Sequence, residues 1–528
     1  MTVYRQFTTI VFILLSGFLY SQKFTTTNKS LATRFSKENT TYLIDELIDL
    51  KGDTLYIGSN STLEFGKGKF CNGIVKVDAN SLDIKGAKGI LENIVLFPIQ
   101  KLNNQVKTKL KTIDASWFGT YGDNNHDDTR FLQNAIESAH NLGVPLFIER
   151  GNYKITSPLV LCDHDEIIGA SDNVVDLANQ RVHTVIRYQG KDKNIVNVCG
   201  KFVRISNLML AANNYYVCDG IKSVGTTLGL CLQNVSIGNT RNALSFELQE
   251  FGGLSLCEFD HLYVSNSEKG INVNSSDKGS SYITYNQFNH LYFTQIKEKG
   301  VYMFASSINS TAFRDCLFAN IGYGDAFDKM LHNKEIYSIE VHSQKVQGNI
   351  TVQGGYFENQ YYSQDGSLIQ SFDYDNNAVF SVENINISLS DVRFANTRTI
   401  IRSKGNDCIK ISNCIDNGAL FSSVKKGYIC NENESTILDI DGYCFSNADK
   451  QILKKSSLKS LLLASLTVKN FRLSDGKISK DIIFRKETND NEMLLSSMMD
   501  YSWSNFLMFT ILLCGYFICR KHKLVKKK

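Results

Sequence analysis

The chain has 528 residues, and its hydrophobic fraction of 43% is ordinary for a folded protein. The net charge of +4 is small for this length and lies partly in the basic tail after residue 519. No folded basic face is indicated, so nucleic acid is excluded as an expected partner. Only three prolines occur. Because proline cannot donate to a β-ladder, this scarcity favours a chain that consists mostly of strands.

The N-terminus, residues 1–22, has the pattern of a secretory signal peptide. Arg5 precedes an apolar run from Phe7 to Tyr20, and the small residue Ser21 offers a cleavage site. An uncleaved N-terminal anchor is the alternative interpretation. In both cases the pattern predicts that the body of the protein is exported.

Residues 23–110 are expected to form a strand-rich lead-in. Short strand-like segments occur at Thr54–Ile57, Leu63–Phe65, Ile74–Val77 and Leu82–Ile84, and glycines separate them. The pattern is typical of extra β-helical coils before a main body.

A helix is predicted next, ending at residue 142. Asp127 or Asp128 stands at its start as the capping residue, and Gly143 stops it. Its apolar face is formed by Phe131, Leu132, Ala135, Ile136 and Ala139. Because the open end of a solenoid core needs a cover, we expect this helix to be an N-terminal cap.

An internal repeat follows the helix. Its template reads apolar, polar, Asn/His/Asp, apolar, any, apolar, any, Asn, and clear copies begin at Ile205, Leu232, Phe259, Phe288 and Phe313. These starts are 27, 27, 29 and 25 residues apart, and later copies begin at Val352, Leu389 and Ile411. A fixed period of this size indicates stacked units, and apolar residues two positions apart indicate strands. No helical pattern lies between the copies, which excludes helical arrays and leucine-rich horseshoes.

Asparagine and similar residues recur at two corners of the repeat, where the left-handed conformation is expected. The first predicted ladder contains Asn207, Asn234, His261, His290, Asp315, Asp391 and Asn413. The second contains Asn239, Asn266, Gln295, Asn320, Asn359 and Asn396. A further strand after each copy, such as Gly270–Val273, gives three strands per coil. Cysteines in or beside the repeat, such as Cys257 and Cys316, are interpreted as buried small hydrophobes rather than disulfides.

The segment Trp117–Arg130, with its Phe-Gly, Gly-Asp and Asp-Asp-Thr motifs, leads through the helix to Gly151-Asn-Tyr153. This series resembles the opening of the rhamnogalacturonase/epimerase-like pectate lyase family. The resemblance covers residues 111 to about 415 and implies an all-β fold, a right-handed parallel β-helix of three strands per coil. It also implies a polysaccharide as the partner. We assign residues 111–445 to this β-helix.

The C-terminal part is predicted to reach a membrane. Residues 446–502 are polar and are interpreted as a small segment and linker, and an uncharged apolar run occupies residues 503–519. This run is at the short limit of a transmembrane helix, and the basic tail 520–528 belongs on the cytoplasmic side. The body would then be extracytoplasmic and tethered to the membrane. A sorting signal that is cleaved during surface attachment and a buried core helix are the alternatives.

Candidate site residues lie at outward positions of the strands, because none of the known catalytic motifs of polygalacturonases or calcium-dependent pectate lyases is found. The candidate catalytic acids are Glu247, Asp325 and Asp328, and the candidate substrate-binding residues are Asn272, Asn274, Tyr302, Tyr263 and Tyr292. Asp123, Asp127 and Asp128 are assigned loop and capping roles. His261 and His290 could form a proton-transfer pair, but their ladder position favours a structural role.

Two functions are compatible with these residues. The first is a polysaccharide lyase or glycoside hydrolase, which predicts acids clustered with Arg, Lys or His along one outward groove. The second is a non-catalytic glycan-binding or spacer protein, which predicts aromatics and amides without converging charges. No metal site is predicted, although a lyase could require calcium. The sequence does not indicate an oligomeric state.

Overall fold

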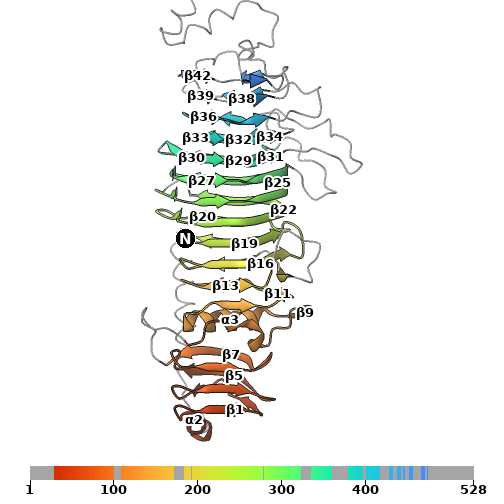
Figure 1. Cartoon of the computed structure of the whole chain (residues 1–528), viewed down its shortest axis with the longest axis vertical. Coiled ribbons are helices and arrows are strands. Elements are labelled where there is room, and N and C mark those ends of the chain that lie inside the picture. Colours follow the sequence, from red (N-terminus) through yellow and green to blue (C-terminus); the bar gives the residue numbers. More distant parts are fainter. Residues whose placement is uncertain are drawn as a thin grey trace, which may run out of the picture. The chain divides into compact units, whose positions relative to one another are not determined.

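The computed structural model describes residues 29–99, 109–171, 183–191, 193–276, 279–322, 335–345, 347–358, 378–395 and 400–416, and six further strands between 427 and 473 (Figure 1). The chain divides into two compact units. The first contains residues 1–120 and 130–146, and the second contains residues 121–129 and 147–528. The sequence-based domain boundaries, by comparison, placed residues 111–146 entirely with the second part.

The first unit consists mainly of two small parallel sheets. One contains β1 (Thr41–Ile44), β4 (Thr62–Phe65) and β6 (Asp83–Lys85). In the other, β5 (Lys69–Val77) pairs with β2 (Leu47–Asp49), β3 (Thr54–Tyr56) and β7 (Leu91–Pro98), also in parallel. The predicted strands of the lead-in are therefore present, and their parallel pairing agrees with a β-helical arrangement.

The predicted helix is α3 (Thr129–Leu142), and it lies against β7. The backbone of Leu96 donates to Ser138 Oγ at 2.9 Å and accepts from Asn141 Nδ2 at 3.1 Å. These bonds satisfy backbone groups that a sheet edge leaves open. The helix ends at Gly143, whose φ of 62° is left-handed, as its position predicts. Its role as the cap of a β-helix stays a prediction.

The second unit is a coil whose strands pair in parallel along three long sheets (Figure 1). A fourth, four-stranded parallel sheet runs through β18 (Thr227–Leu228), β21 (Gly253–Ser255), β23 (Tyr282–Thr284) and β26 (Ser307–Asn309). The first sheet runs through β13 (Glu166–Gly169), the starts of β16 (Arg204–Ala212), β19 (Cys231–Gly238) and β22 (Glu258–Ser275), then β24 (Gln287–Asn289), β27 (Thr311–Arg314), β30 (Gly348–Gln353), β33 (Ile385–Ser390) and β36 (Cys408–Ser412). The second runs through β11 (Gly151–Ile155), β14 (Thr184–Tyr188), the later parts of β16 and β19, the middle of β22, the start of β25 (Tyr292–Ala305), β28 (Leu317–Ile321), β31 (Tyr356–Glu358) and β34 (Arg393–Ala395).

The third sheet carries the candidate site. Its strands are β12 (Leu159–Leu161), β15 (Asn194–Val198), β17 (Asp219–Val224), β20 (Asn242–Leu248), the ends of β22 and β25, β29 (Tyr337–Ser343), β32 (Ala378–Glu383) and β35 (Ile401–Ser403). Three parallel strands per coil confirm the predicted all-β architecture of a parallel β-helix.

Both corner ladders are present among the described residues. All seven members of the first ladder have φ between 51° and 57°. The described members of the second ladder have φ between 49° and 63°, so both ladders are in the left-handed region. Adjacent rungs can bond, as when Asn234 Nδ2 donates to Asn207 Oδ1 at 2.8 Å. Asn359 and Asn396 lie outside the described residues.

The interior of the coil is apolar and stacked in register. Phe259, Phe288 and Phe313 are fully buried, with ring centroids 4.9 and 4.7 Å apart and interplanar angles near 13° and 12°. Cys257 and Cys316 are buried free thiols, as interpreted from the sequence. Burial raises the pKa of each thiol to about 12.

Within the part of the chain that the structure describes, no helix is long and apolar enough to cross a membrane. The predicted signal peptide (1–22), the apolar run 503–519 and the tail 520–528 lie outside the described residues.

Candidate functional site

Charged side chains converge on the outward face of the third sheet, around β29, which lies between β25 and β32 and pairs with both in parallel. Strand β29 alternates, so Ile339 and Val341 are buried in the coil while Glu340 and His342 project outward. In register, Glu340 lies between Tyr302 of β25 and Ser381 of β32. Because the strands pair in register, the outward side chains of successive coils lie in one row.

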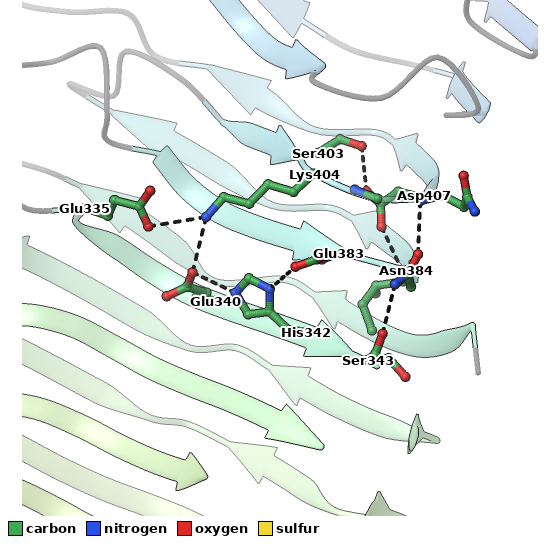
Figure 2. A network of polar contacts seen from close by, with 12 residues as sticks. Glu335, Glu340, His342, Ser343, Glu383, Asn384, Ser403, Lys404 and Asp407 are labelled. Carbon is green, nitrogen blue, oxygen red and sulfur yellow. Dashed lines mark hydrogen bonds and ion pairs between the residues drawn. The ribbon is translucent and has the colours of Figure 1, made fainter. Parts of the chain in front are cut away.

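His342 is held between two carboxylates (Figure 2). Its Nε2 lies 2.7 Å from Glu340 Oε1, and its Nδ1 lies 2.7 Å from Glu383 Oε2 on the next coil. An imidazole donates from both nitrogens only when it is protonated at both. Each ring nitrogen of His342 faces a carboxylate oxygen.

Glu340 is the buried member of this arrangement, with a side chain that is 3% exposed. It forms an ion pair with Lys299, and Lys404 Nζ lies 3.5 Å from its Oε1. Burial acts to raise the pKa of Glu340, but the hydrogen bond from His342 and the charge of Lys299 outweigh it and lower the pKa to about 2. Glu340 is therefore an anion that organises the cations around it.

Lys404, which directly follows β35, belongs to the same cluster. Its Nζ lies 3.3 Å from Glu335 Oε2 and 5.2 Å from the centroid of the Tyr337 ring. Burial raises the pKa of Tyr337. Tyr337 Oη and Ser381 Oγ are buried and have no hydrogen-bond partner among the described residues. Such groups are available to a bound ligand or to water.

A tight polar turn fixes the backbone around Lys404 (Figure 2). The buried carboxylate of Asp407 accepts from Ser403 Oγ at 2.6 Å, Gly405 N at 3.1 Å and Ile385 N at 2.8 Å. Burial raises the pKa of Asp407 despite these bonds. Asp407 is therefore a positioning residue for Lys404.

One carboxylate of the cluster, that of Glu383, is exposed to solvent. Glu383 has a side chain that is 44% exposed, whereas Glu340 and His342 lie behind it at 3% and 13%. A carboxylate oriented by an imidazole that is itself oriented by a third group follows the general layout of activated acid–base sites. Glu383 is the group that can meet a substrate, and His342 and Glu340 hold it in place.

Four of the residues predicted from sequence also face outward on the third sheet. Asn272 lies in register with Tyr302, and Asn274 with Glu247. Tyr302 adjoins the charged cluster, because Lys299 Nζ lies 4.8 Å and Lys269 Nζ 5.6 Å from its ring centroid. Glu247 instead pairs with Lys222 at 2.6 Å. It lies three coils from β29, or roughly 14 Å at the usual strand spacing.

The other predicted candidates are separate from this row. Tyr263 and Tyr292 lie on the second sheet, around a corner from the cluster, with stacked rings 4.8 Å apart at an 11° angle. Asp325 and Asp328 lie outside the described residues.

The aspartates of the family-like loop make backbone contacts, in keeping with their assigned roles. Asp127 Oδ1 accepts from Thr129 N at 3.0 Å, at the start of α3. Asp128 is buried and accepts from Tyr121 N at 2.7 Å and Gly122 N at 3.0 Å. Asp123 accepts from His126 N at 3.0 Å, and this bond and others lower the pKa of Asp123 to about 2.

Sequence reasoning missed Glu340, His342 and Glu383. The strand Tyr337-Ser-Ile-Glu-Val-His-Ser343 does carry a signal, because apolar residues alternate with Glu340 and His342. The long intervals before and after this strand hide its place in the repeat. Glu383 is brought to His342 only by the register between β29 and β32.

A parallel β-helix with a charged site on one outer sheet is the class of protein that these features define. Residues 113–329 match a family profile described as rhamnogalacturonase A/epimerase, pectate lyase-like. The resemblance predicted from the Trp117–Arg130 loop is confirmed. No curated protein gives a significant match to the sequence.

Solved structures with a similar fold include an Acinetobacter phage tailspike protein, with 14% identity and a TM-score of 0.41. The match covers 74% of this chain and 66% of the tailspike, so the chain spans about two thirds of its length. A surface adhesin of Streptococcus pneumoniae has 10% identity and a TM-score of 0.41, with 72% and 97% covered. The A-module of an Azotobacter vinelandii mannuronan C-5 epimerase has 11% identity and a TM-score of 0.29, with 68% and 99% covered.

Proposed function

We propose that the protein is a polysaccharide lyase that acts on an acidic glycan, with its active site around Glu383, His342 and Glu340. The observation that carries the proposal is the convergence of these three groups with Lys299 and Lys404 from neighbouring coils. Converging charges along one outward face are what distinguishes an enzyme from a spacer of the same fold. The family of residues 113–329 supports a polysaccharide as the substrate.

The charges favour an acidic substrate. Lys269 and Lys299 flank the Tyr302 ring beside the cluster, and Lys299 is also paired with Glu340. A sugar carboxylate placed over Tyr302 would meet these ammonium groups. Neutralising that carboxylate makes the proton on the adjacent carbon easier to remove.

In the proposed step, the Glu383 carboxylate takes the proton from the carbon next to the sugar carboxylate. The released electron pair forms a carbon–carbon double bond, and the bond to the glycosidic oxygen breaks. The leaving oxygen takes a proton from solvent. His342 holds Glu383 in position, and the anion of Glu340 holds His342.

We also propose that the protein is exported and tethered to a membrane, on the basis of the apolar segments 1–22 and 503–519 and the basic tail. An enzyme placed in this way would meet glycans outside the cytoplasm.

The test uses the full-length protein against a panel of acidic and neutral polysaccharides, with and without a calcium chelator. Ultraviolet absorbance reports unsaturated products, and a second assay reports reducing ends. We expect unsaturated products from an acidic glycan only, and loss of activity in His342→Gln. His126→Gln is the matched control, because His126 Nδ1 also bonds a carboxylate, Asp123, at 2.8 Å, but its side chain is 58% exposed.

Reducing ends without unsaturation would instead indicate a hydrolase. Inactivity across the panel, combined with glycan binding that Tyr263→Ala weakens, would favour a glycan-binding protein. The stacked pair Tyr263 and Tyr292 is the observation that supports this second candidate.

A further inference from the structure

A group of three side chains that can bind a metal ion lies at the corner between the first and second sheets. Asp260 at the end of a first-sheet strand segment faces two imidazoles, His261 from its own coil and His290 from the next. Asp260 Oδ1 lies 3.0 Å from His261 Nδ1 and 2.8 Å from His290 Nδ1. This is the only such group of three found among the described residues.

The backbone fixes both histidines in matching positions. His261 and His290 have φ of 53° and 52°, so each occupies the same corner of its coil. Their rings stack with centroids 4.5 Å apart. Because the corner geometry is repeated from coil to coil, the two Nδ1 atoms and the carboxylate are held together before any ion arrives.

The donor set selects the kind of ion. Two imidazole nitrogens and one carboxylate oxygen suit zinc and related transition metals, whereas calcium and magnesium prefer oxygen ligands. The three ligand atoms lie within 4.8 Å of one another, and both histidines are exposed, so an ion can enter from solvent and keep open positions for water.

A neighbouring group is also left for such an ion to satisfy. Asn289 lies in register with Asp260 on the next coil. Its Oδ1 is buried and has no hydrogen-bond partner among the described residues. A water bound to an ion at the cluster would bring a donor to this side of the corner.

We propose that Asp260, His261 and His290 form a surface binding site for a divalent transition metal of the zinc class, which links two successive coils. The ion would bind the lone pairs of the two Nδ1 atoms, and each neutral ring would then carry its proton on Nε2. The site lies at the corner between the first and second sheets, whereas the Glu383 cluster lies on the third sheet, and it does not depend on the proposed enzymatic function.

The experiment is a calorimetric titration of the full-length protein with zinc alone, followed by cobalt as a spectroscopic probe. We expect one equivalent of saturable binding and visible absorption bands from bound cobalt. Asp260→Asn should weaken zinc binding by at least about tenfold, and the double variant His261→Gln/His290→Gln should abolish it. His126→Gln, which changes another exposed histidine bonded to an aspartate, should bind as the parent does.

Circular dichroism of each variant separates loss of the site from loss of the fold. If the double variant does not fold, Asp260→Asn alone decides the outcome, because it preserves the shape of the side chain. The proposal would be overturned if the parent protein showed no saturable zinc binding. It would also be overturned if the folded double variant still bound zinc, or if Asp260→Asn bound zinc as tightly as the parent.

Discussion

Glu340 and His342 lie two positions apart on the same strand, and the imidazole Nε2 of His342 lies 2.7 Å from the Glu340 carboxylate. The strand alternation that buries Ile339 and Val341 places both polar residues on one outer face. On the next coil, the Glu383 carboxylate lies beside the other ring nitrogen of His342, Nδ1. A buried anion, an imidazole and an exposed carboxylate are thus aligned across two coils.

The buried Glu340 should make a large contribution to stability at neutral pH. Glu340→Gln leaves Lys299 and Lys404 without their shared anion, and we expect a loss of about 3 kcal/mol in the free energy of unfolding at pH 7. The pKa of Glu340 is lowered to about 2 from an ordinary 4.5, so its stabilisation is present above pH 4.5 and is lost as the pH falls toward 2. Denaturant unfolding of both proteins at pH 7 and pH 3 measures this. A deficit that does not shrink at low pH would contradict the assignment.

The corner ladder should be tested at Asn234, which has a φ of 52° and bonds Asn207. Asn234→Ala removes the bond and places a residue with a strong right-handed preference in a left-handed corner, so we expect a loss of roughly 2 kcal/mol. Asn234→Gly loses the bond but accepts the conformation, and its loss should be clearly smaller. Denaturation midpoints compare the two, and equal losses would show that the conformation does not matter there.

Substitutions of Tyr302 and Tyr263 test whether the substrate binds on the third sheet or on the second. Tyr302 adjoins Lys299 and Lys269 beside the charged cluster, while Tyr263 stacks on Tyr292 of the second sheet. We expect Tyr302→Ala to lower kcat/KM on an acidic glycan by tenfold or more, on the order of 1.4 kcal/mol. Tyr263→Ala should change it by less than about twofold. A reversed order would move the site to the second sheet.

Glu247 was predicted from sequence as a catalytic acid, and the structure allows a sharp test of that assignment. It forms an exposed pair with Lys222, so Glu247→Gln should cost less than about 1 kcal/mol of stability. Because Glu247 lies roughly 14 Å from β29, we expect kcat to change little. Loss of activity with an intact fold would restore Glu247 as a catalytic residue.

The fold was predictable because its signals are local and repeated. The copies that begin at Leu232 and Phe259 fix the strands, and Asn234 and His261 mark the corner directly in the sequence. The lead-in and the helix with Gly143 at its end follow from equally local patterns. The loop Trp117–Arg130 further indicated a resemblance to one family, and the profile of that family matches residues 113–329.

The site was less predictable because it depends on register across long intervals. His342 and Glu383 are 41 residues apart and meet only because β29 pairs with β32. Lys404, which comes from yet another coil, has its Nζ 3.5 Å from Glu340 Oε1. Tyr302 and Asn272 could be placed on the correct sheet from local alternation, but no local pattern shows which coil carries the charges.

The most direct test of the central claim compares the full-length parent and Glu383→Gln on an acidic polysaccharide, with unsaturated product followed by absorbance. The account predicts steady product formation by the parent and a rate at least a hundredfold lower in the variant, with both proteins unfolding at similar denaturant concentrations. Equal rates in the two proteins would show that proton transfer takes place elsewhere on the coil.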